Sequence, residues 1–325
     1  MTEYDKKHWE NIKAYLRRTQ RAFHVNADQL ANLYAGLGVS HPFDLNQHPQ
    51  IKKAIEKRLR ELAKNMEKSI VNGIHNEWVL SNNKNDEMVA GLLKGRTLPP
   101  DLQEKYFARN SSAMTAFIKR TEAGMGLSDR IWETVRGHSV NIEREMALGI
   151  YERTPSKELA SQIKKHLNEP DRLYRRVRDA SGELRLSRAA RQFEPGRGKY
   201  RSAYKNALRL TRTETNKAYQ KADAERWKQQ DFVLGVRVHR SSGAPYPCDI
   251  CEAGVGDYPK DYEWDLFHPN CLCYSTTIEA SEEEFDKHLD ALMEGKEHHF
   301  DGYVQDIPDS FKELQQKTNY QHMGH

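Results

Sequence analysis

The chain has 325 residues, of which 37% are hydrophobic and 30% charged, and its net charge is +4 at neutral pH. No stretch approaches the ~18 consecutive apolar residues of a membrane span, and Met1–Lys7 has no apolar core of a secretory signal. These totals argue against a membrane partner. The length allows one large domain or two ordinary ones, and we expect long polar helices around modest cores.

Helical periodicity dominates the first third of the chain. Residues 3–24 carry apolar side chains at helical spacing, and a second, longer run begins at Pro49. Its apolar stripe consists of Ile51, Ile55, Leu59, Leu62, Met66, Ile70, Ile74 and Trp78. We expect the stripe to pack on a neighbouring helix of the same chain; the alternative is a docking face for another protein. Breaks are predicted at residues 82–86 and 97–100, and residues 1–110 are assigned to an N-terminal helical region.

Further helices are predicted in the middle of the chain. Patterning resumes near Ser111, pauses at residues 124–126 and restarts with Ser128 as a predicted N-cap. Thr154 and Pro155 have the sequence of another helix start, and residues 168–170 end that helix. A helix-turn-helix over residues 140–167 is an alternative to an ordinary connection between two helices.

The segment of residues 164–212 is strongly basic, with 15 Lys and Arg against five Asp and Glu, and aromatic residues are interleaved. Such a pattern suits non-specific contact with the phosphates of double-stranded DNA. The alternative is that these arginines pair with acidic faces of this chain or of a partner. The predicted nucleic-acid-binding residues are Arg172, Arg175, Arg176, Arg178, Arg185, Arg188, Arg191 and Arg197.

The periodicity changes near residue 230. A helix is predicted over residues 202–229; within it Arg212 and Glu214, two positions apart, are expected to pair with different elements. Residues 232–239 and 273–278 then read as two partnered strands. Residues 279–325 are assigned to an acidic C-terminal tail, and its polar part, which follows the acidic residues up to Glu297, is expected to be mobile or ordered by a partner. The predicted fold is therefore mainly α with a small β element in the C-terminal part.

All four cysteines lie within 26 residues, as Cys248 and Cys251 in a C-x-x-C and Cys271 and Cys273 in a C-x-C, with His268 just before the second pair. Two such knuckles are typical of a structural zinc site, so zinc is the predicted cofactor. Zinc takes four ligands, and five are on offer. Either Cys248, Cys251, His268 and one residue of the C-x-C bind it, or all four cysteines do. Free thiols or a disulfide without metal are the third option.

Two enzymatic alternatives start from the same motif. A zinc deaminase shares the P-C-x-x-C half, but its H-x-E half is matched only by His75–Glu77, far upstream. A zinc-dependent nuclease would need an additional histidine, and His239, His298 and His299 are candidates without a supporting motif. A catalytic zinc also keeps one position open to water, whereas ligands are in surplus here. We therefore expect a structural site and no enzymatic activity.

Three stretches together resemble the phage Mu F-like minor head protein (head morphogenesis) family: Leu173–Arg178, Leu210–Tyr219 and the C-x-x-C…H-P-N-C-x-C end. The resemblance covers about residues 112–278, which it implies are a head morphogenesis domain spanning 111–278. It also implies a minor capsid protein of a tailed phage or prophage.

Such a protein binds the portal vertex and contacts packaged DNA during head assembly or DNA ejection. Its expected partners are the portal protein, the major capsid or scaffolding protein and DNA. Its expected location is the virion, and the cytoplasm of the bacterial host during assembly. The family's metal motif maps onto Cys248, Cys251, His268, Cys271 and Cys273. The alternative is a zinc-containing nucleic-acid-binding protein that acts alone.

Overall fold

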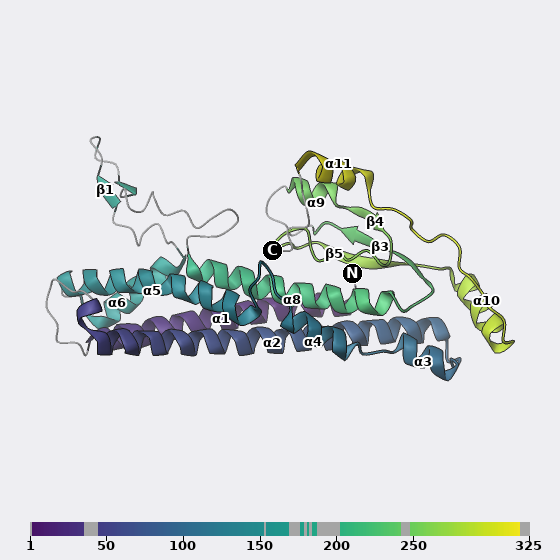
Figure 1. The fold of residues 1–325 in the computed structure, drawn as a ribbon, viewed down its shortest axis with the longest axis horizontal. Coiled ribbons are helices and arrows are strands. Elements are labelled where there is room, and N and C mark those ends of the chain that lie inside the picture. The colour runs from purple at the N-terminus through teal and green to yellow at the C-terminus, as the bar shows by residue number, and fades with distance from the viewer. Residues whose placement is uncertain are drawn as a thin grey trace. The chain divides into compact units, whose positions relative to one another are not determined.

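The computed structural model describes residues 2–35, 45–152, 154–168, 176–178, 181, 184–186, 202–241 and 248–318. The fold is mainly helical with a small antiparallel sheet, which confirms the predicted class (Figure 1). Its helices are α1 (Glu3–Ala35), η1 (Leu45–Gln47), α2 (Pro49–Leu93), α3 (Pro100–Tyr106), α4 (Ser111–Lys119), α5 (Leu127–Glu152), α6 (Ser156–Asn168), α8 (Ala203–Trp227), α9 (Asp249–Ala253), α10 (Glu282–Met293) and α11 (Asp309–Thr318). Its strands are β1 (Arg176–Arg178), β2 (Leu184–Leu186), β3 (Val233–His239), β4 (Gly256–Tyr258) and β5 (Tyr274–Glu279).

The chain divides into two compact units, and the division falls within α1, α2 and α8. We call residues 1–12, 72–123 and 213–325 the sheet unit, because they contain β3, β4 and β5. We call residues 13–71 and 124–212 the helical unit; β1 and β2 form a two-stranded antiparallel pair within it. None of the helices in the described part of the chain has the length and apolar character that crossing a bilayer requires.

The apolar stripe of α2 is buried, as predicted. In the helical unit its residues Ile55, Leu59, Leu62, Met66 and Ile70 are all at most 3% exposed. Because the stripe is already covered by the chain itself, the alternative of a docking face for another protein is wrong for these residues. Burial of each such side chain contributes roughly 1.5–3 kcal/mol relative to exposure.

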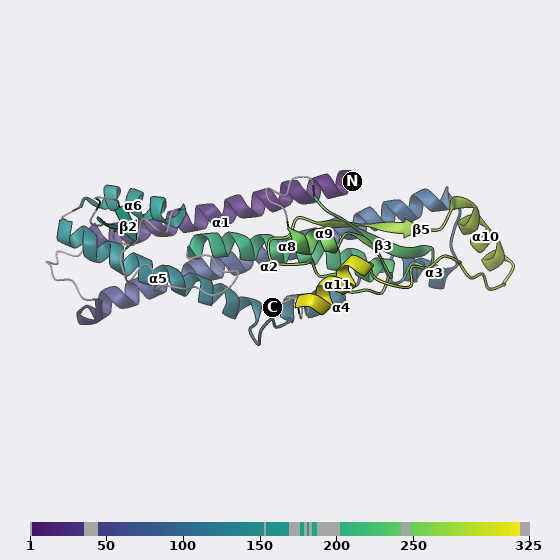
Figure 2. The ribbon, with the colours of Figure 1, turned by 90° about the horizontal axis from the view of Figure 1, so that it is seen from above.

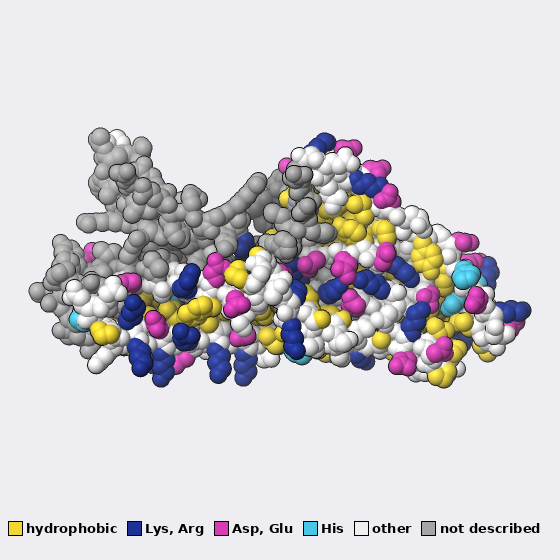
Figure 3. Space-filling view, in the orientation of Figure 1, with side chains coloured by type: hydrophobic (Ala, Val, Ile, Leu, Met, Phe, Trp, Pro, Cys, Tyr) yellow, Lys and Arg dark blue, Asp and Glu magenta, His cyan; other side chains and the backbone are white. Residues whose placement is uncertain are grey.

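The opposite face of α2 is basic. Exposed cations recur every three or four residues, and Figure 3 shows Lys and Arg gathered along this helix. They are Lys53, Lys57, Arg60, Lys64 and Lys68. Since side chains at this spacing share one helix face, they form a continuous basic row.

The sheet unit contains the strands that the change in periodicity predicted. β3 pairs with β5 in antiparallel register, with Val236 opposite Thr277, and the sheet order is β4-β3-β5. β4 was not predicted, because three residues are too few to show an alternating pattern. One core of this unit joins the end of α2, α3, the end of α8, β3 and α10, around Val89, Trp227, Phe232 and Phe285.

The predicted break at residues 82–86 is wrong, because α2 continues through it to Leu93. The side-chain amide of Asn82 donates to the carbonyl oxygen of Trp78 at 2.9 Å, and that of Asn85 to the carbonyl of Ser81 at 2.9 Å. Asn85 also donates to Asp223 at 2.8 Å. These two side chains are buried and hydrogen-bonded inside the fold through their NH2 groups, so they are not the surface loop that their composition suggested.

Two further expectations differ from the structure. Residues 309–318 form a helix whose Phe311 is buried, so the expectation of a mobile or partner-ordered polar tail is wrong over this helix. The acidic residues 282–293 before it also form a helix, with Phe285 and Leu289 buried. Ser128 is not an N-cap, since α5 begins one residue earlier and the Ser128 hydroxyl is hydrogen-bonded to Glu67.

Candidate metal centre

The first knuckle is formed around the short helix α9. Cys248 occupies the N-cap position with an extended backbone, at φ −138°, and Cys251 lies in the helix. The amide of Glu252 donates to the carbonyl oxygen of Cys248 at 2.9 Å, which closes the first turn. Two cysteines three positions apart on such a turn present their sulfur atoms to the same side, so the C-x-x-C spacing produces a pair of convergent thiols.

The second knuckle is a tight turn that leads into β5. Its key residue is Asn270, whose φ of 68° lies in the left-handed region that asparagine tolerates better than most residues. The amide of Cys271 donates to the carbonyl oxygen of His268 at 3.1 Å. The turn folds His268 back beside Cys271, and Cys273 follows immediately before the strand.

All five predicted ligands meet in one cluster. His268 Nε2 lies 3.3 Å from Cys248 Sγ and 3.1 Å from Cys251 Sγ, and the Sγ atoms of Cys251 and Cys271 are 3.7 Å apart. The cluster consists of two overlapping groups: Cys248, Cys251 and His268, and Cys251, Cys271 and Cys273. Within each group the ligand atoms lie within 4.8 Å of one another, and Cys251 belongs to both.

This geometry fits a tetrahedral metal ion. Two thiolates bound at about 2.3 Å in tetrahedral geometry are about 3.8 Å apart, close to the 3.7 Å between Cys251 and Cys271. The cluster can therefore hold a metal ion. The two ligand sets left open by the sequence both draw on both groups, and each group supplies three convergent ligand atoms.

The electrostatics of the thiols also suit a cation. Hydrogen bonds from the thiols of Cys251 and Cys273 lower the pKa of Cys271 far below its usual range, while hydrogen bonding to Cys271 raises the pKa of Cys251. Of the three buried thiols, that of Cys271 therefore loses its proton most readily. A thiolate is the form of cysteine that binds a metal, so the cluster already favours the first charge that a bound cation needs.

Aromatic side chains close the site from outside. Cys251, Cys271 and Cys273 are at most 5% exposed and share a core with Tyr258, Trp264, Leu266, Phe267 and Phe311. Gly254, next to α9, is packed so tightly that an added Cβ would lie 2.2 Å from Cζ of Phe267. Any side chain at position 254 would therefore displace the ring that precedes His268.

Helix α8 is hydrogen-bonded to the second knuckle. The amide of Asn270 donates to Thr213 Oγ1 at 2.9 Å, and Asn216 Nδ2 donates to the carbonyl oxygen of Cys271 at 3.2 Å. These contacts join the Leu210–Tyr219 stretch directly to the H-P-N-C turn. Glu214 forms an ion pair at 2.9 Å with Arg120, which lies outside α8, as predicted for a partner on a different element.

Behind Asn216 lies a buried pair that the sequence did not point to. Asn216 Oδ1 is 3.0 Å from His8 Nε2, and His8 Nδ1 is 2.6 Å from Glu77 Oε2. All three residues are at most 1% exposed. The one available signal was their polarity within otherwise apolar helix faces. Glu77 is thus engaged with α1, while His75 is exposed and belongs to neither ligand group, so the two halves required by the deaminase alternative are not assembled.

Other candidate residues lie apart from this cluster. His239 contacts Thr276 Oγ1 at 2.8 Å, and His298 lies near His288 and Phe300. Of the predicted nucleic-acid-binding residues, Arg176 and Arg178 lie on β1 and Arg185 on β2. Arg172, Arg175, Arg188, Arg191 and Arg197 lie outside the described residues.

Comparisons with protein-family models, curated proteins and solved structures find no match to this chain. The chemistry of the site and the sequence motifs around it are therefore the basis for any functional conclusion.

Proposed function

We propose that this chain is a Mu F-like minor head protein of a tailed phage or prophage, which binds the portal vertex and contacts packaged DNA. The observation that supports the proposal best is the contact between its two most specific motifs. The Leu210–Tyr219 helix and the H-P-N-C-x-C turn are some 50 residues apart in sequence, yet they are joined by two hydrogen bonds, Asn216 to Cys271 and Asn270 to Thr213. The motifs thus behave as parts of one folded element, as a family signature would.

The metal in this proposal is zinc with a structural role. Thiolate and imidazole donors in tetrahedral spacing are typical of structural zinc. The three sulfur atoms of Cys251, Cys271 and Cys273 are buried, and five ligands compete for four positions. Such a site has no position left for a reacting water, so the metal shapes the sheet unit and takes no part in chemistry.

The proposed DNA contact is best supported by the basic row on α2. The basic row on α2 presents Lys53, Lys57, Arg60, Lys64 and Lys68 to solvent. A row of cations binds phosphates without reading bases, and it releases counterions as it does so. The arginine-rich segment of residues 172–197 is proposed to add to this contact.

The experiment that tests the proposal is co-purification with the portal protein encoded by the same phage or prophage genome. We expect a complex that survives high salt, because shape and apolar contact hold it. Duplex DNA binding by the chain alone should be weak and fall steeply with salt. Lys57→Gln with Lys64→Gln should flatten that salt dependence and leave the portal complex intact. If no portal complex forms while DNA binding is tight, the stand-alone nucleic-acid-binding alternative replaces the proposal.

A further inference from the structure

Strand β5 forms an open edge of the three-stranded sheet. In the described part of the chain the sheet order is β4-β3-β5, so β5 pairs with β3 on one side only (Figure 2). An antiparallel edge strand turns alternate N–H and C=O groups outward, ready to pair with another chain. The segment Tyr274–Glu279 contains neither Pro nor Lys, the residues that commonly block such pairing.

The segment before α11 packs on β4. At Gly256 an added Cβ would lie 2.7 Å from Cγ of Pro308. Because Cβ atoms point out of the plane of a sheet, this contact covers a face of the strand. On β3, the carbonyl oxygen of Leu234 accepts a hydrogen bond from the amide of Val304. In the described part of the chain both β4 and β5 have one side without a strand neighbour, and residues 304–308 pack against β3 and β4.

A pocket of about 650 Å³ lies beside β5. It is lined by Ser275, Thr276, Thr277 and Glu279, by the first turn of α1, by one face of α2 and by Trp227. Trp227 is 3% exposed, and its indole N–H has no hydrogen-bond partner among the described residues. The pocket is large enough for a long side chain and offers donors as well as apolar surface.

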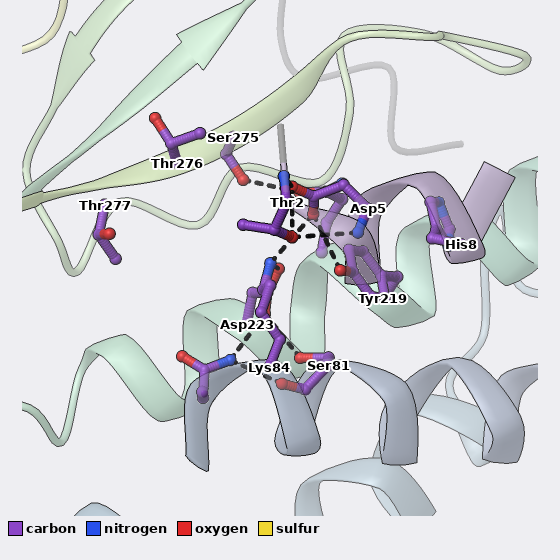
Figure 4. A network of polar contacts seen from close by, with 12 residues as sticks. Thr2, Asp5, His8, Ser81, Lys84, Tyr219, Asp223, Ser275, Thr276 and Thr277 are labelled. Atoms are coloured by element: carbon purple, nitrogen blue, oxygen red, sulfur yellow. Dashed lines mark hydrogen bonds and ion pairs between the residues drawn. The ribbon is translucent and has the colours of Figure 1, made fainter. Parts of the chain in front are cut away.

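The charge of this pocket is negative. Four carboxylates line it, Glu3, Asp5, Glu87 and Glu279, against one ammonium group, that of Lys84. Lys84 forms an ion pair with Asp223, which is labelled beside it in Figure 4, and its Nζ also lies 3.5 Å from Asp5 Oδ1. Within the described chain Glu87 and Glu279 form no ion pair, and both are exposed. The lining therefore has carboxylate charge in excess.

We propose that β5 accepts an extended basic segment of a partner protein as a fourth strand, with one Arg or Lys side chain seated in the adjacent acidic pocket. The strand edge would supply backbone hydrogen bonds, which give affinity, and the pocket would select the side chain. Arginine fits best, because its planar guanidinium pairs with carboxylates at two points and stacks on aromatic rings such as Tyr4. The proposal stands apart from the phage assignment, since it rests only on this edge and pocket.

Fluorescently labelled peptides test this site on the full chain. The probe is a short peptide of alternating Thr and Val with one central Arg, and two controls carry Gln at that position or N-methyl groups on alternate backbone amides. Anisotropy should show the Gln peptide binding about tenfold more weakly than the Arg peptide, and the N-methylated peptide not binding. Failure of the Arg peptide to bind, equal affinity for Arg and Gln, or indifference to N-methylation would each overturn the inference.

A charge reversal separates a specific pocket from general attraction. Glu87→Lys should weaken binding of the Arg peptide about tenfold and shift the preference to a peptide with a central Glu. Glu297→Lys, at an exposed position that does not line the pocket, changes the net charge equally and should leave binding unchanged. Equal losses in the two variants would show that only net charge matters and would refute the site.

Discussion

The sheet unit holds buried polar groups in two different ways. In the Cys/His cluster the ligands come from two short turns close in sequence, and a bound cation would satisfy them together. In the second region, which we call the α2–α8 network, Asp223 of α8 accepts hydrogen bonds from Ser81, Lys84 and Asn85 of α2, some 140 residues away. Both regions are buried, but a bound ion could satisfy the first, whereas Asp223 in the second finds its hydrogen-bond donors within the chain itself.

The electrostatics of the network show why its members need one another. Burial raises the pKa of Asp223, and the charge of Lys84 acts against that rise. Lys84 also packs over the rings of Tyr219 and Trp227, at 4.6 and 5.5 Å. A carboxylate in such a place is stable only while its partners remain, because an unpaired buried charge is strongly unfavourable.

The largest effect is expected from a substitution in the Cys/His cluster. Cys251→Ser removes the one ligand common to both groups, so metal content should fall to background and the sheet unit should lose its folded near-UV signal. Structural zinc contributes on the order of 10 kcal/mol to folding in small zinc domains. Cys273→Ser should retain metal at lower affinity, because Cys271 still offers a fourth ligand. Elemental analysis and circular dichroism check both variants; full metal content in Cys251→Ser would contradict the assignment.

The next largest effect is expected from a substitution in the α2–α8 network. Asp223→Ala removes the acceptor of the Ser81 hydroxyl and leaves Lys84 with Asp5, 3.5 Å away, as its one ion-pair partner among the described residues. We therefore expect a loss of about 3 kcal/mol in the free energy of unfolding. Metal content should stay unchanged, which urea denaturation combined with elemental analysis would show. Asp286→Ala, which removes a half-exposed partner of Arg96, should cost less than about 1 kcal/mol. Comparable losses in the two variants would mean that the network has no special role.

A glycine substitution sharpens the comparison at the rim of the metal site. Gly254→Ala forces the ring of Phe267 aside, and overpacking of this kind costs about 1–3 kcal/mol. Metal affinity should fall with it, because Phe267 precedes His268. Gly91→Ala is the matched control: nothing lies within 4 Å of an added Cβ there, and Ala favours a helix by up to about 1 kcal/mol. Thermal unfolding of the two variants should shift in opposite directions.

The smallest effect concerns a surface cluster that resembles neither buried region. Hydrogen bonds from Lys228 and Lys221 lower the pKa of Glu263 to about 2, from an ordinary value of about 4.5. A lowered pKa in the folded state stabilises the protein above pH 4.5, and this contribution is lost as the pH falls towards 2. Because Glu263 is largely exposed, Glu263→Gln should cost less than about 1 kcal/mol at pH 7. The difference from the unsubstituted protein should vanish near pH 2 in urea titrations; a constant difference would contradict the pairing.

The sequence was informative wherever a signal is local. The spacing of Cys248, Cys251, His268, Cys271 and Cys273 predicted a cluster that the structure assembles, since metal ligands follow short, regular intervals. The stripe from Ile55 to Trp78 predicted a buried helix face in the same way. Both patterns repeat within a few residues, so they can be read without knowledge of the fold.

The sequence was misleading where polar residues are buried by distant partners. Asn82 and Asn85 read as a surface break, yet their NH2 groups are hydrogen-bonded within α2, and α8 contributes Arg226 to Asn82 and Asp223 to Asn85. Asn216 lies in the Leu210–Tyr219 stretch that carries the resemblance, but its contact with the second knuckle was not predicted, because its partners His8 and Cys271 lie far away along the chain. Composition alone cannot distinguish a polar residue that is solvated from one that a remote helix satisfies.

The position of α11, at the end of the described chain, determines when the Cys/His cluster is covered during synthesis. Phe311 of this helix packs into the core around the cysteines, and the hydroxyl of Ser310 donates to the carbonyl oxygen of Ala253 beside α9. A growing chain exposes all five ligands before the ribosome has delivered the helix that covers them. An ion that the cluster can hold would therefore bind before α11 packs over it, and the packing of α11 would then slow the escape of that ion from the finished protein.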